Sequence, residues 1–182
     1  GGYMLDGSNF LRERVLAFTT QVASAYRFDE VAAFHLEVFH TPEDELVLCE
    51  VACRAGGGAT MDSCAAACGF RYDELALLAS IDRQVIEAAR RVYDGGTRLG
   101  AYLQVPPRTG LLRRIPSSIP FGWVASYLPN GDVGRCYEAG TKCADNILQA
   151  VILGDSELEL VGRLAELECW LSQQIDWDFE HA

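Results

Sequence analysis

Two glutamates and one arginine lie close together in the sequence and could carry chemistry. Glu37 belongs to the segment 34–39 (FHLEVF), and Glu50 and Arg54 belong to the segment 48–54 (LCEVACR). Carboxylates are the ligands that hard divalent cations prefer. A guanidinium binds carboxylate or phosphate groups through paired hydrogen bonds. These residue types suit a site for a divalent cation and an anionic substrate.

A polar turn with a proline, residues 41–45 (TPEDE), separates the two segments and predicts a β-hairpin. If the hairpin is symmetric about the bond between residues 43 and 44, Glu37 stands directly opposite Glu50, and Arg54 falls opposite Ala33. Because side chains alternate between the faces of a strand, the two glutamates and Arg54 share one face. The other face is apolar, and we expect it to face the core; it carries Phe34, Leu36, Val38, Val47, Cys49, Val51 and Cys53.

Two carboxylates that face each other across a strand pair repel one another unless a proton or a cation lies between them. A hard divalent ion such as Mg²⁺ or Mn²⁺, held by Glu37 and Glu50, would remove the repulsion and leave positions for phosphate oxygens. The glycines Gly56, Gly57 and Gly58 follow at once. They allow a ligand to approach the backbone closely and precede a predicted helix N-terminus, which favours anions.

A second interpretation of the same residues stays open on spacing alone. Exposed glutamates are common in hairpins, so Glu37 and Glu50 could line a solvated sheet face with Arg54 as a surface ion-pair partner. His35 and His40 are candidates for contacts near the site, although a single histidine in a strand is more often structural. By parity His40 points to the apolar face.

The two segments and the following glycines resemble the C-terminal half of an ATP-grasp ligase. The likeness lies in residues 34–40 (FHLEVFH) and 48–58 (LCEVACRAGGG), and it is closest to the carboxylate–amine ligase branch that includes the L-amino acid ligases. It is specific over residues 31–70 and diffuse over 97–175. In many members an asparagine metal ligand lies two residues after the second glutamate; here that position is Ala52.

The resemblance implies a set of roles for the site residues. Glu37 and Glu50 would bind the Mg²⁺ that bridges the ATP phosphates, and Arg54 would contact the acyl phosphate or the substrate carboxylate as the catalytic residue. Residues 56–58 would shape the substrate pocket. ATP would phosphorylate a small carboxylic acid, and an amine would attack the acyl phosphate to give an amide or peptide bond and ADP.

The resemblance also implies that the chain is a fragment, because the family's ATP-binding lysines precede this region and Lys142 is the only lysine here. We therefore expect no ATPase activity from the chain alone. Two other functions remain candidates: a stand-alone Mg²⁺-dependent hydrolase, which needs more ligands than two glutamates, and a non-catalytic interaction or dimerisation module. The aromatic residues Trp170, Trp177 and Phe179 favour the module, unless they cover the core.

The helices and strands predicted from the sequence indicate an α+β fold with a mostly antiparallel sheet. Helical spacing predicts helices over 8–26, 60–69, 73–93 with a break near Ser80, and 156–174. Strands are predicted over 32–39, 46–53, 99–105, 111–115, 122–128, 133–138 and 149–153. We divide the chain into a lobe with the metal-binding hairpin, residues 1–96, and a β-rich subdomain with a terminal helix, residues 97–182. The tail 176–180 has no assignment.

Composition excludes several classes of function. The 182 residues carry a formal net charge of −11, the opposite of a nucleic-acid-binding surface. No apolar run is long enough to span a membrane. Seven cysteines include no CxxC pair, so reduced, buried thiols in a cytoplasmic protein are expected rather than a zinc site or disulfides. The expected partners are small molecules and a second copy of the chain, as a homodimer, if an apolar patch is exposed.

Overall fold

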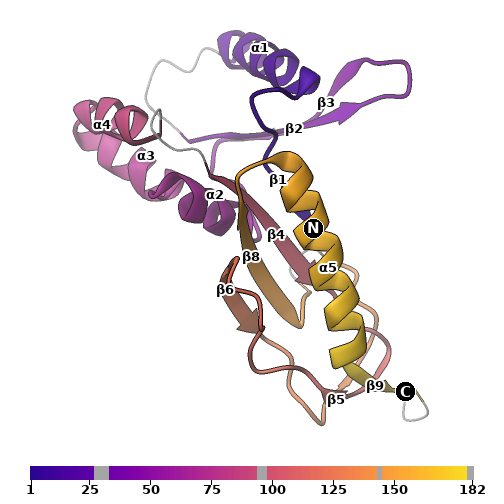
Figure 1. Cartoon of the computed structure of the whole chain (residues 1–182). Coiled ribbons are helices and arrows are strands. Elements are labelled where there is room, and N and C mark those ends of the chain that lie inside the picture. Colours follow the sequence, from indigo (N-terminus) through magenta and orange to yellow (C-terminus); the bar gives the residue numbers. More distant parts are fainter. Residues whose placement is uncertain (27–32, 94–97, 143–144, 180–182) are drawn as a thin grey trace.

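The computed structural model describes residues 1–26, 33–93, 98–142 and 145–179 (Figure 1). Within these ranges the helices are α1 (Phe10–Ala25), α2 (Thr60–Cys68), α3 (Tyr72–Ile81), α4 (Gln84–Tyr93) and α5 (Glu157–Gln174). The strands are β1 (Gly2–Tyr3), β2 (His35–His40), β3 (Leu46–Ala52), β4 (Leu99–Val105), β5 (Gly110–Arg114), β6 (Val124–Pro129), β7 (Cys136–Tyr137), β8 (Leu148–Gly154) and β9 (Asp176–Asp178).

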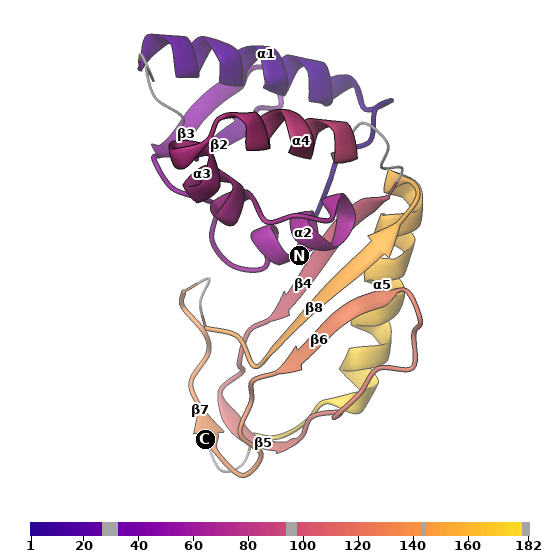
Figure 2. The ribbon, with the colours of Figure 1, turned by 90° about the vertical axis from the view of Figure 1, so that its left-hand side faces the viewer.

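The described strands form three sheets in which each pairing is antiparallel. The main sheet has the order β1-β4-β8-β6, the hairpin β2-β3 stands apart, and a small sheet has the order β7-β5-β9. The predicted α+β class with antiparallel sheets is therefore confirmed. Figure 2 shows the main sheet in the lower half of the molecule, with the hairpin and α1 at the upper end.

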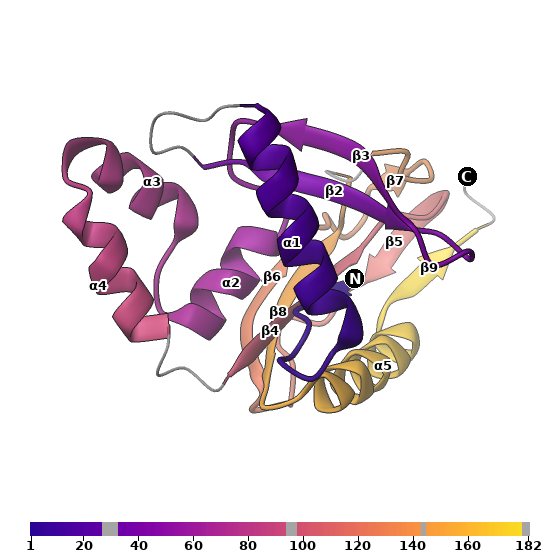
Figure 3. The same ribbon diagram turned by 90° about the horizontal axis from the view of Figure 1, so that it is seen from above.

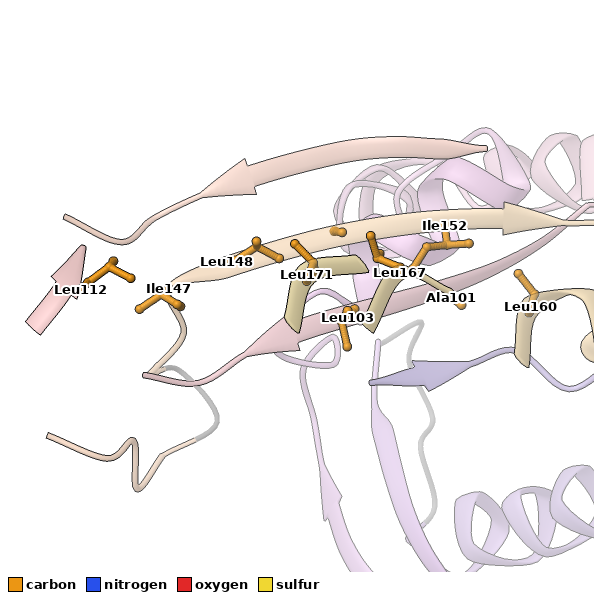
Figure 4. Packing of buried hydrophobic residues seen from close by; sticks show 10 residues of the cluster. Ala101, Leu103, Leu112, Ile147, Leu148, Ile152, Leu160, Leu167 and Leu171 are labelled. Carbon is orange, nitrogen blue, oxygen red and sulfur yellow. The ribbon is translucent and has the colours of Figure 1, made fainter. Parts of the chain in front are cut away.

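The core lies between the main sheet and α5 (Figure 4). Ser156 caps α5 by accepting a hydrogen bond from the backbone N–H of Glu159, as its sequence predicts. From this start Leu160, Leu167 and Leu171 fall on one stripe and are at most 2% exposed. They pack against buried residues of β4 and β8, among them Ala101, Leu103, Leu148 and Ile152.

Helix α2 covers the opposite face of the main sheet, and Figure 3 shows the strands between α2 and α5. The approach is close because Gly100 of β4 has no side chain. A Cβ built on Gly100 would lie 2.3 Å from the backbone oxygen of Ser63. This contact anchors α2, and with it the glycine loop that precedes the helix, on the sheet.

The β2–β3 hairpin contributes no buried residue, so the predicted core face is wrong. Phe39, Val47 and Leu48 are 61%, 44% and 40% exposed. Helix α1 lies across the hairpin (Figure 3) and leaves Leu36 and Val38 half-buried. The apolar residues of the hairpin therefore pack against α1, and the main core lies between the main sheet and α5.

Most predicted elements match within two or three residues, including the break between α3 and α4 and the left-handed Gly69 that ends α2. The strand predicted over 133–138 is reduced to β7, and the unassigned tail forms β9 beside β5. The glycines expected to end α4, at 95–96, lie outside the described residues. So does the predicted boundary between 96 and 97, and that division stays a prediction.

Cysteine burial differs from the expectation. Cys68 is buried and Cys64 is half-buried, and burial raises the pKa of both thiols. Cys49, Cys53, Cys136 and Cys169 are exposed, and Cys143 lies outside the described residues. None of the helices in the described ranges has the length and apolar character needed to cross a membrane.

We predict that Gly100→Ala destabilises the fold by about 2–3 kcal/mol, because the added methyl group overlaps backbone that cannot rotate away. Urea unfolding followed by circular dichroism measures the change. Gly122→Ala is the matched control, since its Cβ would meet nothing within 4 Å. Equal stability of the two variants would contradict the close approach of α2.

We also predict an alkaline loss of stability that depends on Tyr127. Its hydroxyl donates to the carbonyl of Pro116 at 2.6 Å, and burial raises its pKa to about 12 from 10.0. The folded state therefore keeps the proton longer than the unfolded state, so this contribution is complete below pH 10 and declines as the pH rises toward 12.

Tyr127→Phe should cost about 1 kcal/mol at neutral pH for the lost hydrogen bond. The variant should also show a shallower decline in the free energy of unfolding between pH 10 and 12. Denaturant titrations across that interval test both points. The same decline in wild type and variant would show that Tyr127 does not carry the effect.

Candidate functional site

The register of the hairpin places Glu37 directly opposite Glu50, as the sequence predicts. Residues that face each other in an antiparallel pair lie on the same side of the sheet. Both side chains are about half exposed, at 58% for Glu37 and 50% for Glu50. The two carboxylates therefore share one accessible face, where a ligand can reach them.

A β-bulge interrupts the hairpin next to this pair. The partner of Val38 is Leu48, so Cys49 is an extra residue without a partner in the ladder. The Cys49 thiol lies 3.9 Å from Glu37 Oε2 and donates to it. The bulge also places Val47 opposite Phe39. Assigning Cys49 and Val47 to the apolar face was therefore wrong.

His35 completes the cluster. Its Nε2 lies 3.5 Å from Glu37 Oε1 and 3.6 Å from Glu50 Oε1, so both carboxylates point toward a single nitrogen. The ring is only 16% exposed, and among the described residues its buried Nδ1 has no hydrogen-bond partner. The carboxylates thus converge on the His35 Nε2 atom, and a cation bound on their exposed side would offset their mutual repulsion.

Arg54 lies at the end of β3 on the same side. Its Nη2 is 3.7 Å from Glu50 Oε1, and its Nη1 donates to the backbone oxygen of Ala55 at 3.1 Å. The side chain is 58% exposed, so its remaining donors face solvent. An anion bound beside the two glutamates could accept hydrogen bonds from this guanidinium.

The glycine loop lies over the main sheet. Gly58 has φ of +60°, and a Cβ there would be 3.2 Å from the Gln104 Oε1 of β4. Gln104 donates to Gln149, and Gln149 donates to Asp62, which pairs with Arg71. No sequence motif marks this polar chain. Its members are single polar residues far apart in sequence, and pairing of β4 with β8 brings them together.

The tip of the hairpin forms a separate charged cluster away from the glutamate pair. Arg14 of α1 contacts Asp44 at 2.6 Å, and His40 contacts the same carboxylate at 2.7 Å. The Arg14 guanidinium, with His40 second, holds the pKa of Asp44 below its usual range. His40 therefore fastens the turn and α1, and the structure does not bring it to the candidate site.

The described residues contain no group of three or more histidine, cysteine or acidic side chains arranged to hold a metal ion. A divalent cation at this hairpin would have Glu37 and Glu50 as protein ligands and would need further oxygens from a bound molecule or water. That donor set still fits a hard ion, because both ligands are carboxylates and open positions remain.

Solved structures that resemble this one include two ATP-grasp ligases. Phosphoribosylglycinamide synthetase from Anaerococcus prevotii matches with a TM-score of 0.66 and 11% identity, over 97% of this chain and 44% of that one. L-amino acid ligase from Bacillus licheniformis matches with a TM-score of 0.67 and 14% identity, over 97% and 46%. This chain has a partial ATP-grasp fold.

The ATP-grasp likeness confirms the fold that the hairpin sequence resembles. The chain spans less than half the length of either ligase, and the matched part is their C-terminal part. No protein-family model matches the sequence, and no curated protein matches it. The likeness establishes the fold, and the roles of the site residues remain predictions.

We predict that Gly58→Ala costs about 1–2 kcal/mol of stability, because a side chain is strained at this left-handed φ and would press on Gln104. Gly57→Ala is the control, since its Cβ would meet nothing within 4 Å. Thermal unfolding of both variants measures the difference. If Gly57→Ala proves as costly as Gly58→Ala, the loop does not have this conformation.

Proposed function

We propose that the chain supplies the metal-binding and acyl-phosphate-binding part of an ATP-dependent carboxylate–amine ligase. One observation carries the proposal: Glu37 and Glu50 face each other in the hairpin and converge on one point, with Arg54 beside them. The ATP-grasp fold supports it, because the same hairpin lies within a fold shared with two ligases.

The proposed chemistry has two steps. In the first, an oxygen of a carboxylic acid attacks the terminal phosphorus of ATP, the bond to ADP breaks, and an acyl phosphate forms. In the second, an amine attacks the acyl carbon, phosphate leaves with the carbon–oxygen bond electrons, and the amine loses a proton. The products are an amide, ADP and phosphate.

Each site residue has a defined task in this scheme. Glu37 and Glu50 would hold Mg²⁺ or Mn²⁺, which supplies positive charge against the transferred phosphoryl group when bound. Arg54 would donate hydrogen bonds to the acyl phosphate and stabilise its charge. His35 would position the two carboxylates. Its imidazole is mostly buried, whereas the two glutamate side chains are about half exposed. The loop 56–58 would border the substrates.

A non-catalytic interaction module is the second candidate function. Three apolar side chains of α3 support it, because Leu77, Leu78 and Ile81 are 68%, 53% and 83% exposed. Sedimentation distinguishes this candidate, since a stable homodimer would bury that surface and a monomer at high concentration would not. A stand-alone hydrolase has less support, because the described residues contain no group of three or more histidine, cysteine or acidic side chains arranged to hold a metal ion.

Binding of Mn²⁺ together with acetyl phosphate, a simple acyl phosphate, tests the ligase proposal on this chain alone. The loss of the free Mn²⁺ electron paramagnetic resonance signal measures the bound ion. We predict that Glu37→Gln and Glu50→Gln each weaken binding at least about tenfold, because each removes a charged ligand from a site with two. Acetyl phosphate should strengthen the binding of Mn²⁺ to the wild-type chain. Arg54→Gln should remove this effect and leave the binding of Mn²⁺ without acetyl phosphate unchanged.

Glu45→Gln is the matched control, since Glu45 is an exposed glutamate at the hairpin turn and lies away from the pair. Unchanged Mn²⁺ affinity in both glutamate variants would contradict the metal assignment. In a longer protein that joins this chain to a nucleotide-binding lobe, the same two substitutions should abolish ADP release while the protein stays folded. Retained ADP release in both would refute the proposed role.

A further inference from the structure

A cavity of about 340 Å³ lies between α2, α3, α4 and the start of β2. Figures 1 and 3 show these three helices together at the end of the hairpin where β2 begins. The cavity walls are mainly apolar and include Phe34, Met61, Leu75 and Ile86. A volume in this range and an apolar lining with a few polar groups are typical of small-molecule sites.

One side chain joins this cavity to the acidic pair. His35 lines the cavity, and the Nε2 atom of the same ring lies 3.5 Å and 3.6 Å from the two glutamates. His35 is therefore common to the cavity lining and to the acidic cluster. A molecule of a few bonds' length can place one end in the cavity and the other beside the carboxylates.

A positively charged side chain lies next to the cavity lining. Ala55 and Gly56 line the cavity, and Arg54 donates to the backbone oxygen of Ala55 at 3.1 Å. The guanidinium thus contacts a residue of the lining, and more than half of its side chain is exposed. This arrangement suits a ligand with an apolar body and an anionic head.

His35 also has a buried nitrogen, Nδ1, that lacks a hydrogen-bond partner within the described residues. A buried polar atom without a partner is costly. Because this atom is out of contact with solvent, the apolar walls and the nearby guanidinium, rather than this nitrogen, define the ligand.

We propose that this cavity binds the apolar side chain of the carboxylic acid substrate, so that its carboxylate reaches Arg54. The proposal rests on the proposed ligase function for the fate of that carboxylate. The binding itself requires neither ATP nor turnover. It assigns the substrate class: a carboxylic acid with an aromatic or branched aliphatic group a few bonds from the acid.

The test titrates the 182-residue chain with 3-phenylpropanoate and follows methyl resonances by nuclear magnetic resonance. Mg²⁺ is present throughout, since the two glutamates would otherwise repel an anion. We expect methyl shifts at Met61, Leu75 and Ile86 and none at Leu158, which is 84% exposed on α5. Propanoate should bind at least about tenfold more weakly, because it lacks the ring that the cavity encloses.

Ala76→Phe fills the cavity, since the half-buried Ala76 of α3 is part of its lining. We expect it to weaken 3-phenylpropanoate binding at least about tenfold. Ala88→Phe is the matched control, because Ala88 is exposed on α4 and does not line the cavity. Equal affinity of the two variants for the acid would overturn the proposal.

Arg54→Gln provides a second test if Ala76→Phe fails to fold. The arginine side chain is exposed, so this substitution should not disturb folding. It should weaken binding of 3-phenylpropanoate and leave binding of the neutral 3-phenylpropanol unchanged. Tighter binding of phenethylamine than of the acid would overturn the assignment to the acid substrate. So would equal affinity for propanoate and 3-phenylpropanoate.

The two proposals fail in different experiments. Ala76→Phe should leave Mn²⁺ binding with acetyl phosphate intact, because the cavity does not contain the glutamates. Loss of acid binding in Ala76→Phe with unchanged Mn²⁺ binding supports the cavity assignment. If Mn²⁺ binding proves independent of Glu37 and Glu50, the ligase proposal fails, whereas the cavity is judged by the acid titration alone.

Discussion

The contact between α2 and β4 at Gly100 determines how the two parts of the molecule are joined. On one side is the main sheet with its buried leucines under α5. On the other is a hairpin without a buried residue of its own, which could not hold a fixed position by burial alone. Because backbone meets backbone at this glycine, α2 is held close to the sheet. The loop 56–58 and β3 come directly before α2, so the position of the acidic pair depends on the same contact.

The acidic pair has an electrostatic cost that its surroundings reduce. Two carboxylates opposed across a strand pair destabilise a hairpin, and water lowers that cost because both are about half exposed. His35 and Arg54 lie beside the pair, and the Cys49 thiol donates to Glu37. These neighbours are single donors or partly exposed cations, and they offset the negative charge of the two carboxylates only in part. The site therefore still favours the binding of a positive charge. The remaining negative charge makes the glutamate pair suitable for binding a divalent ion.

Local signals in the sequence predicted the helices well. Ser156, Asn9 and Gly69 act as the caps that their residue types favour. The predicted pairing of Glu37 with Glu50 is confirmed, but the turn alone does not set it. The ladder that starts at the turn pairs Val38 with Leu48, and the extra residue Cys49 shifts the register by one so that Glu37 meets Glu50.

Features that depend on distant partners could not be predicted. Strand β9 forms because Trp177 pairs with Leu112, and β1 because Tyr3 pairs with Ala101; neither short segment has a pattern of its own. The bulge at Cys49 carries no glycine or proline to signal it. The cavity beside His35 arises where three helices meet the start of a strand, and no local spacing describes such a space.

The bulge separates two functions within one hairpin. Beyond it the ladder runs from Val38 opposite Leu48 to the turn that Asp44 closes with Arg14 and His40. On the near side, Glu37 and Glu50 keep their own pairing. The tip therefore holds α1, whereas the pairing that aligns the glutamates lies on the other side of the bulge. An insertion that displaced Asp44 would release Arg14 of α1 from the turn, so a peptide tag is better placed away from this tip.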